Sequence, residues 1–186
     1  MTATDIKDLL SKGEHITTEC KKAQGGIPKS IWETYSAFAN TDGGIILLGI
    51  DEVKVNNGVQ YEITGVSDAD KLVKEFWSTI NSTKVSVNVL MNDDVEIVKA
   101  DGKDVIVIHV PRAAYNFRPV YINDNPAKGT YRRNHEGDYH CTDSEWRAMV
   151  RDASDDGNDG HIVEYYTMDD IDSDTLHRYR TAFMLR

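Results

Sequence analysis

Short apolar patterns, each bounded by turn-forming residues, follow one another along the chain. The nearly continuous apolar run 45–50 is typical of a strand that is buried on both faces. Residues 68–80 place five large apolar side chains on one helical stripe, which predicts an amphipathic helix. Valines at alternate positions over 85–89 predict a half-buried strand. The remaining expected elements are helices over 5–10, 28–40 and 143–150 and strands over 15–21, 60–64, 95–99, 105–110 and 129–134.

The C-terminal part of the chain has a different character. Residues 153–160 are polar, acidic and glycine-containing, which is typical of a linker. Beyond them a helix is predicted by four apolar residues at helical spacing, Leu176, Tyr179, Phe183 and Met184. Either this helix packs back on the domain, or a C-terminal domain follows it in a longer protein. The expected divisions are a domain over 1–152, a linker over 153–160 and the start of a following region over 161–186.

Composition and charge exclude several classes of protein. The chain has 186 residues and a formal net charge of −10, which excludes a uniformly basic, histone-like binder of nucleic acid. Its longest apolar run is far shorter than the roughly 20 residues of a membrane helix, and its start has no apolar segment of the signal-peptide kind. Cys20 and Cys141 do not make a disulfide framework. These features predict a cytoplasmic protein without a membrane partner.

One segment departs from the acidic balance. Between Pro111 and Arg133, five bases stand against a single acid, and four aromatic residues interleave with them. Bases mixed with aromatics suit a phosphate backbone with stacked bases, so the segment is a candidate nucleic-acid surface. The alternative is a loop whose tyrosines pack on the core and whose arginines are solvated. The candidate binding residues are Arg112, Arg118, Lys128, Arg132, Arg133, Tyr115 and Tyr121.

The most specific stretch is 37–52, Ala-Phe-Ala-Asn-Thr-Asp-Gly-Gly-Ile-Ile-Leu-Leu-Gly-Ile-Asp-Glu. It resembles the signature of the Schlafen Alba-type domain family, once labelled a divergent AAA family. The flanks agree with this resemblance. Residues 14–21 resemble the family's Glu-x4-Glu-Phe-Lys strand with Cys20 in place of the aromatic residue, and 130–133 resemble its Tyr-x-Arg strand. The resemblance covers residues 10–150.

This resemblance implies an α+β fold, an Alba-like mixed sheet packed by helices, here with a C-terminal helical extension. It also implies binding of nucleic acid, with DNA the first expectation, by the N-terminal module of a transcriptional regulator, and it implies a homodimer. Such binding requires no cofactor. An alternative from another class is a protein-interaction or oligomerisation module, in which the acidic surface and the terminal apolar stripe carry the function.

A second alternative is enzymatic. Some Schlafen family members are metal-dependent ribonucleases, and the motif positions of their acidic residues match Glu14, Glu19 and Asp51 here. Three converging carboxylates would hold Mg²⁺ or Mn²⁺, and Lys21 would stabilise charge that develops on a phosphate. Residues five apart face opposite sides of a straight strand, so Glu14 must lie outside the strand for the three to meet. The opposing interpretation is three solvated carboxylates, one of them paired with Lys21.

The glycines of the signature invite comparison with a phosphate-binding loop. Gly44 and Gly49 have the spacing of a Walker motif, but the required Lys-Ser/Thr pair does not follow them, which excludes ATP binding by that mechanism. We expect Gly43 and Gly44 to form a tight turn with positive φ. Asn40 and Thr41, at the end of the preceding helix, either cap that helix or offer hydrogen bonds to a ligand.

Overall fold

The computed structural model describes residues 1–13, 16–56, 58–154, 167, 170 and 172–184. The chain divides into two units, Met1–Ser154 and Asp155–Arg186. The described residues of the larger unit form the strands β1 (Thr18–Lys21), β2 (Gly44–Leu48), β3 (Ile50–Val55), β4 (Gly58–Ile63), β5 (Val95–Ala100), β6 (Lys103–Val110), β7 (Tyr131–Asn134) and β8 (Gly137–His140). Its α-helices are α1 (Ala3–Lys12), α2 (Ile31–Asn40), α3 (Ala69–Ile80), α4 (Pro126–Gly129) and α5 (Asp143–Ala153), with 3-10 turns η1 (Asn92–Asp94) and η2 (Tyr115–Phe117). The smaller unit contains the helix α6 (Ser173–Met184).

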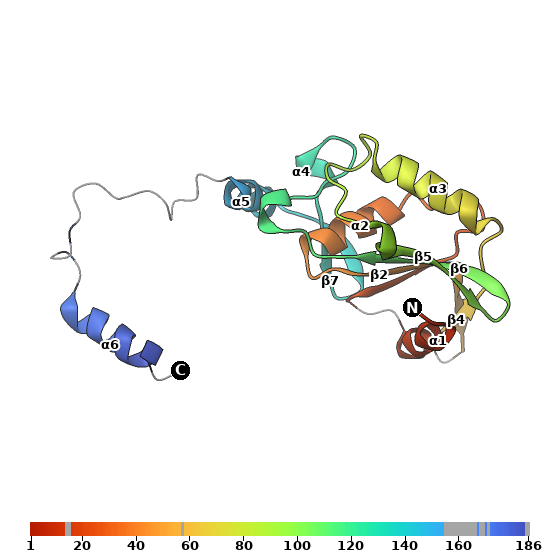
Figure 1. The fold of residues 1–186 in the computed structure, drawn as a ribbon, viewed down its shortest axis with the longest axis horizontal. Coiled ribbons are helices and arrows are strands. Elements are labelled where there is room, and N and C mark those ends of the chain that lie inside the picture. The colour runs from red at the N-terminus through yellow and green to blue at the C-terminus, as the bar shows by residue number, and fades with distance from the viewer. Residues whose placement is uncertain (14–15, 57, 155–166, 168–169, 171, 185–186) are drawn as a thin grey trace. The chain divides into compact units, whose positions relative to one another are not determined.

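A four-stranded mixed sheet in the order β1-β2-β6-β5 forms the centre of the larger unit (Figure 1). β1 and β2 are parallel, and α2 lies on the crossover between them, as parallel pairing requires. β6 is antiparallel to both β2 and β5. This mixed sheet with helices packed on it confirms the α+β fold class that the resemblance implies.

β2 is buried on both faces, as its apolar run predicts. Ile46 and Leu48 pack with α2 and α3 on one face, whereas Leu47 packs with Ile6 of α1 on the other. Figure 1 shows this layering, with α2 and α3 on one side of the sheet and α1 on the opposite side. Each large aliphatic side chain buried in this way contributes about 1.5–3 kcal/mol to folding, so the central strand anchors two separate apolar clusters.

The prediction of a strand over 85–89 is wrong. Only Val85 pairs, in an isolated bridge with Ile122. The backbone further along is held by a side chain instead, because the Tyr35 hydroxyl donates to the Val87 carbonyl (3.1 Å) and accepts from the Val89 amide (2.8 Å). The alternating valines therefore reflect packing on the core and not a strand ladder.

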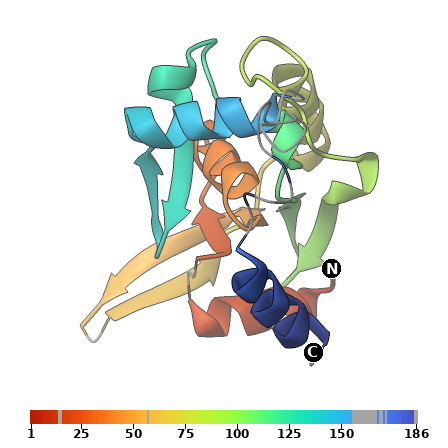
Figure 2. The same ribbon diagram turned by 90° about the vertical axis from the view of Figure 1, so that its left-hand side faces the viewer.

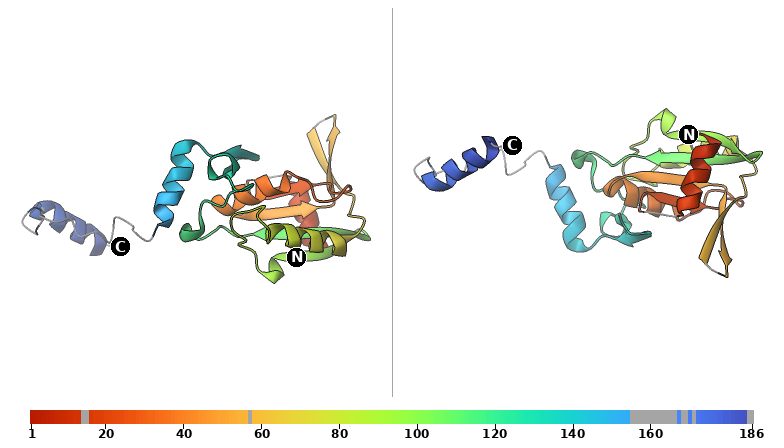
Figure 3. Two further views of the ribbon diagram at one scale, coloured as in Figure 1. Left: turned by 90° about the horizontal axis from the view of Figure 1, so that it is seen from above. Right: turned by 90° about the horizontal axis from the view of Figure 1, so that it is seen from below.

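Two hairpins extend beyond the central sheet. The strand predicted over 60–64 corresponds to β4, which pairs with β3 in a two-stranded sheet that projects from the body of the larger unit (Figures 2 and 3). The strand predicted over 129–134 is shorter, because α4 ends at Gly129 and β7 then pairs with β8. The sequence pattern does not predict β8, since its four residues lack apolar alternation. Among the described residues, no helix has the length and apolar character needed to cross a membrane.

Gly43→Ala is expected to destabilise the larger unit more than Gly102→Ala does. Both glycines have a φ near +75°, namely +77° and +75°, which costs a substituted alanine about 1–2 kcal/mol. A Cβ at Gly43 would also lie 2.7 Å from the Val110 carbonyl oxygen, whereas one at Gly102 meets open space. Urea denaturation should show an additional loss of roughly 1–3 kcal/mol for Gly43→Ala. Equal losses would mean that the chain after β6 does not approach Gly43 as described.

Stability at alkaline pH is expected to depend on Tyr35. Burial raises the pKa of its hydroxyl to about 12 from 10.0, against the lowering effect of the Val89 hydrogen bond. The neutral phenol therefore stabilises the fold fully below about pH 10, and this contribution is lost as the pH rises towards 12, at about 1.4 kcal/mol per pH unit. Urea midpoints measured across this window should fall less steeply for Tyr35→Phe than for the wild type. The exposed control Tyr139→Phe should keep the wild-type slope.

Candidate nucleic-acid interface

The polar residues at the end of α2 hold the basic segment in place. Asn40 is only 5% exposed, and its amide nitrogen donates to the carbonyls of Val120 (2.8 Å) and Tyr131 (2.9 Å). Its amide oxygen accepts the Val120 N–H at 2.8 Å. Asn40 therefore faces the chain itself and neither caps α2 nor presents its amide to a ligand. A buried amide with these partners rigidifies the segment that it binds.

Ser36 and Thr41 extend this attachment along the same segment. The Ser36 hydroxyl donates to the Val120 carbonyl (2.7 Å) and accepts the Tyr131 N–H (3.0 Å). The Thr41 hydroxyl donates to the Ala37 carbonyl (2.8 Å) and accepts the Arg133 N–H (3.0 Å). We call Ser36, Asn40 and Thr41 the α2 clamp. Through it, the second half of α2 and the residue after it position the residues between η2 and β8.

The signature glycines allow the chain to approach itself closely. Gly43 has positive φ and lies against the backbone of Val110. Gly49 has a φ of +98°, and a Cβ added to it would lie 2.9 Å from the carbonyl carbon of Gly65. Gly44 serves a different purpose, because a Cβ there would lie 2.7 Å from the Phe38 ring. The expected positive φ is therefore found at Gly43 and not at Gly44.

The basic and aromatic residues of the segment differ in how far they reach solvent. Tyr115 and Phe117, on η2, are 59% and 51% exposed. Arg112 and Lys128 are exposed, and Arg118, Tyr121 and Arg132 are half-buried. η2 packs beside α5, and α4 also contacts α5. The interpretation that all the tyrosines pack on the core is therefore wrong for Tyr115, whereas Tyr131 is buried.

The arginines also differ in their counter-charges. Arg132 Nε lies 3.0 Å from a Glu145 carboxylate oxygen. Backbone and side-chain hydrogen bonds from Thr142 lower the pKa of Glu145, which keeps this carboxylate ionised beside Arg132. Arg112 lies 3.6 Å from Asp42. Arg118 forms no ion pair with any described residue, and its buried Nε has no hydrogen-bond partner among them. Arg118, a half-buried guanidinium that forms no close ion pair, is the arginine best suited to an external anion, and Asp152 lines the same small pocket as Arg118.

Arg133 does not belong to the solvent-exposed surface. It is 4% exposed, and its guanidinium lies 2.9 Å from a carboxylate oxygen of Glu19 and 2.9 Å from one of Asp138. It also lies over the Phe38 ring, 5.1 Å from the centroid. The predicted phosphate contact does not fit this position, because the guanidinium is enclosed by the fold and already paired with two carboxylates.

The candidate carboxylates are held by basic side chains. Lys21 Nζ lies 2.7 Å from one oxygen of Glu19, and Arg133 contacts the other. Asp51 pairs with Lys22. Glu14 lies outside the described residues, so the expected trio with Lys21 beside it is not tested as a whole. Within the part of the chain that the structure describes, no three side chains of His, Cys, Asp or Glu form a group that could hold a metal ion.

Some residues of this region are not singled out by the sequence reasoning. Phe117 stands between two chosen residues in the sequence, and its exposure is visible only in the structure. Arg147 stacks over the Trp146 ring at 5.0 Å on α5. Asp138, which pairs with Arg133, also accepts a hydrogen bond from Thr34 at 2.6 Å. Asp138 lies on β8, which the pattern does not predict, so no sequence signal connects it to Glu19.

Comparison with known proteins agrees with this architecture. The family model described as Schlafen, AlbA_2 matches residues 14–142, so the chain belongs to that family. A second model, for a domain of unknown function (DUF8451), matches residues 147–186. No curated protein matches the chain.

Among solved structures, the chain resembles the N-terminal domain of a protein from Nitrosomonas europaea that is related to the ATP-dependent DNA helicase RecG. The two are 31% identical, with a TM-score of 0.59, and the match covers 76% of this chain and 94% of that domain. A second match, to the DIP2311 protein from Corynebacterium diphtheriae, has 17% identity and a TM-score of 0.49, and covers 80% of this chain and 28% of that protein.

Asn40→Ala is expected to destabilise the larger unit by about 2–4 kcal/mol, because it removes the hydrogen-bond partner of the buried Val120 N–H and that of the Tyr131 carbonyl. Asn134→Ala, at an exposed position, is the matched control and should cost less than about 0.5 kcal/mol. Urea denaturation followed by fluorescence measures both losses. If the two variants unfold at the same urea concentration, the amide does not hold the basic segment.

Proposed function

We propose that this domain binds nucleic acid through the Arg118 surface, which we define as Tyr115, Phe117, Arg118 and Lys128. The observation that carries the proposal is Arg118 itself, a half-buried guanidinium without an ion pair among the described residues, beside two exposed aromatic rings. Phosphate would supply the missing counter-charge, and bases would stack on the rings. Membership of the Schlafen AlbA_2 family and the likeness to a domain from a helicase-related protein support a nucleic-acid-related module.

The charge of the chain limits how strong this binding can be. A net charge of −10 repels a polyanion at long range. Arg132, Arg133 and Arg112 have carboxylates within 4 Å, which leaves Arg118 and Lys128 as the cations of the surface. With two phosphate contacts, the logarithm of the affinity should fall with the logarithm of salt concentration with a slope of roughly −2. Binding should therefore be weak and depend on low ionic strength.

The alternatives are less well supported. Both oxygens of Glu19 contact cations of the chain itself, so the described contacts do not favour the metal-dependent ribonuclease. A role as the N-terminal module of a transcriptional regulator, a preference for DNA and a homodimer stay predictions that the resemblance makes.

Fluorescence anisotropy with duplex DNA, single-stranded DNA and a structured RNA tests the proposal directly. At low salt the wild-type chain should bind at least one of the three. Arg118→Ala and Lys128→Ala should each weaken binding several-fold and reduce the salt slope by about 1, because each removes one phosphate contact. Tyr115→Ala should weaken binding of a single strand more than binding of a duplex, since stacking contributes about 1–3 kcal/mol per base.

Matched controls lie elsewhere on the larger unit. Lys74→Ala removes an exposed lysine of α3, and Tyr139→Ala removes an exposed tyrosine of β8. Both should bind as the wild type does. The absence of binding to all three probes at tens of micromolar protein would overturn the proposed function. Binding that survives Arg118→Ala and Lys128→Ala together would show that nucleic acid uses another surface.

A further inference from the structure

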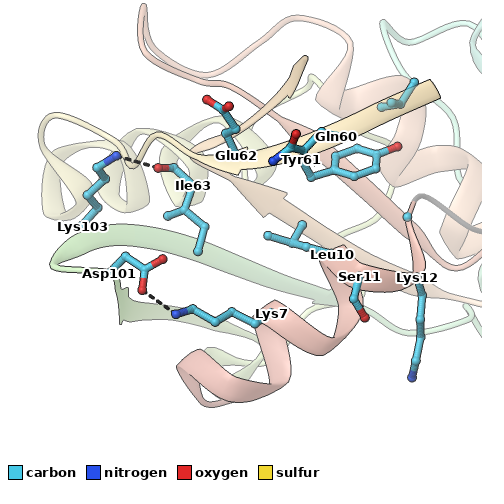
Figure 4. A pocket seen from close by; sticks show the side chains of 12 residues that line it. Lys7, Leu10, Ser11, Lys12, Gln60, Tyr61, Glu62, Ile63, Asp101 and Lys103 are labelled. Atoms are coloured by element: carbon cyan, nitrogen blue, oxygen red, sulfur yellow. Dashed lines mark hydrogen bonds and ion pairs between the residues drawn. The ribbon is translucent and has the colours of Figure 1, made fainter. Parts of the chain in front are cut away.

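The helix α1 is fastened to the turn that connects β5 and β6. Lys7 of α1 pairs with Asp101 of this turn at 2.5 Å, and both residues line a groove of about 810 Å³ beside β4 (Figure 4). Ile6 of the same helix packs with Val98 and Ala100 of β5. One face of β5 is therefore covered by α1, and the outer edge of the strand lies beside that covered face.

The backbone of β5 alternates between its neighbour and this outer edge. β5 pairs only with β6 among the described strands. The two residues of the connecting turn both have positive φ, so Ala100 and Lys103 exchange two hydrogen bonds across it. Hydrogen-bonded and non-hydrogen-bonded pairs alternate along antiparallel strands. The backbone N–H and C=O groups of Val95, Ile97 and Lys99 therefore point away from β6.

The outward backbone groups of β5 are open to a further strand. The Asp104 carbonyl, opposite Lys99, accepts the Val66 N–H at 2.9 Å on the far side of β6, as the alternation requires. Within the described part of the chain, nothing bonds the outward backbone groups of Ile97 and Lys99. Figure 2 shows β5, in light green, at the rim of the larger unit. Open strand edges are templates for pairing with another chain.

The charges along this edge indicate which chain it pairs with. Asp93 and Asp94 lie in η1 directly before β5, and Lys99 lies near the end of the strand. Asp93 is exposed and forms no ion pair with any described residue. The Lys99 side chain is 75% exposed, and its pair with Asp104 is of the solvent-exposed kind that contributes about 0–1 kcal/mol. Between the two ends, Ile97 is 39% exposed on the face opposite α1. An edge that is acidic at one end, apolar in the middle and basic at the other is complementary to a reversed copy of itself.

We infer that the outer edge of β5 pairs antiparallel with β5 of a second copy of this chain, about a two-fold axis at Ile97. The two copies of Ile97 would exchange main-chain hydrogen bonds, and Val95 would lie opposite Lys99 of the partner subunit. A long side chain reaches the diagonal neighbour on the facing strand, which brings each Lys99 towards Asp93 of the other copy. Every contact occurs twice, as in an isologous interface.

This pairing would join the two four-stranded sheets into one. It gives a surface to the homodimer that the family resemblance implies. It uses none of the residues of the Arg118 surface, so it stands or falls independently of the proposed nucleic-acid binding.

Sedimentation equilibrium and amide hydrogen exchange of the full chain test this inference together. Sedimentation should show a dimer whose fraction rises with protein concentration and falls with salt, because exposed charge pairs are screened. Where the dimer forms, the amides of Ile97 and Lys99 should exchange at least tenfold more slowly than in dilute solution. The amides of Glu96 and Val98, which bond β6, should change much less. A chain that stays monomeric at millimolar concentration, or a dimer in which Ile97 and Lys99 exchange as in the monomer, would overturn the inference.

A pair of variants at the axis tests the strand edge. Ile97→Pro removes one outward N–H, at an edge position where proline is tolerated, whereas Ile97→Thr keeps that N–H. The dimer dissociation constant should be at least tenfold larger for Ile97→Pro than for Ile97→Thr. Equal dissociation constants would mean that the main chain at Ile97 takes no part in the interface.

Charge reversal tests the orientation of the two strands. Asp93→Lys and Lys99→Glu should each weaken the dimer at least fivefold, and the double variant should return it to within about twofold of the wild type, because opposite charges meet again. Lys29→Glu, at an exposed position outside β5, is the matched control and should dimerise as the wild type does. A double variant that is as weak as the single variants would overturn the antiparallel pairing, since the two ends would then not meet.

Discussion

The buried amide of Asn40 is the contact on which the geometry of the candidate surface depends. It joins the end of α2 to Val120 on one side and to Tyr131 on the other, while Ser36 bonds the same two residues. The segment between them contains little regular structure of its own, so its backbone needs partners from outside. The end of α2 thus holds Val120 and the start of β7 in place relative to the central sheet.

This attachment also explains why the folded segment presents fewer bases to solvent than its sequence contains. The Arg133 backbone bonds Thr41, and its guanidinium lies over the Phe38 ring. Its charge is therefore buried, where it pairs with Glu19 and Asp138. A buried ion pair is weak evidence for stability, because desolvation offsets much of the attraction. Its clearer consequence is that Lys21 and Arg133 each hold one oxygen of Glu19. An acidic residue of the family motif therefore takes part in the packing of the fold.

The Arg118 surface and the groove beside β4 lie on different parts of the larger unit, since β4 pairs with β3 outside the four-stranded sheet. The first follows β6 and is supported by the α2 clamp, and the second lies between α1 and the hairpin that follows β2. β2 links both, because α2 and α3 cover one of its faces and α1 covers the other.

The sequence by itself determined the family of the domain and those elements that have a strong hydrophobic periodicity. The run 45–50 indicated a doubly buried strand, the stripe over 68–80 indicated α3, and the signature 37–52 indicated the family, because each signal is local and strongly patterned. The alternating valines of 85–89 led to a wrong prediction, since the backbone of Val87 and Val89 bonds Tyr35, which lies 52 and 54 residues earlier in the sequence.

Only the tertiary structure decided which charged residues are available. Arg118 and Arg133 look alike in the sequence, but the partners of Arg133 come from β1 and β8, and the absence of an ion pair at Arg118 among the described residues follows from the packing around η2. The groove beside β4 is likewise formed by α1 and β4, which are far apart in the chain. Burial and counter-charge are long-range properties, and no local pattern encodes them.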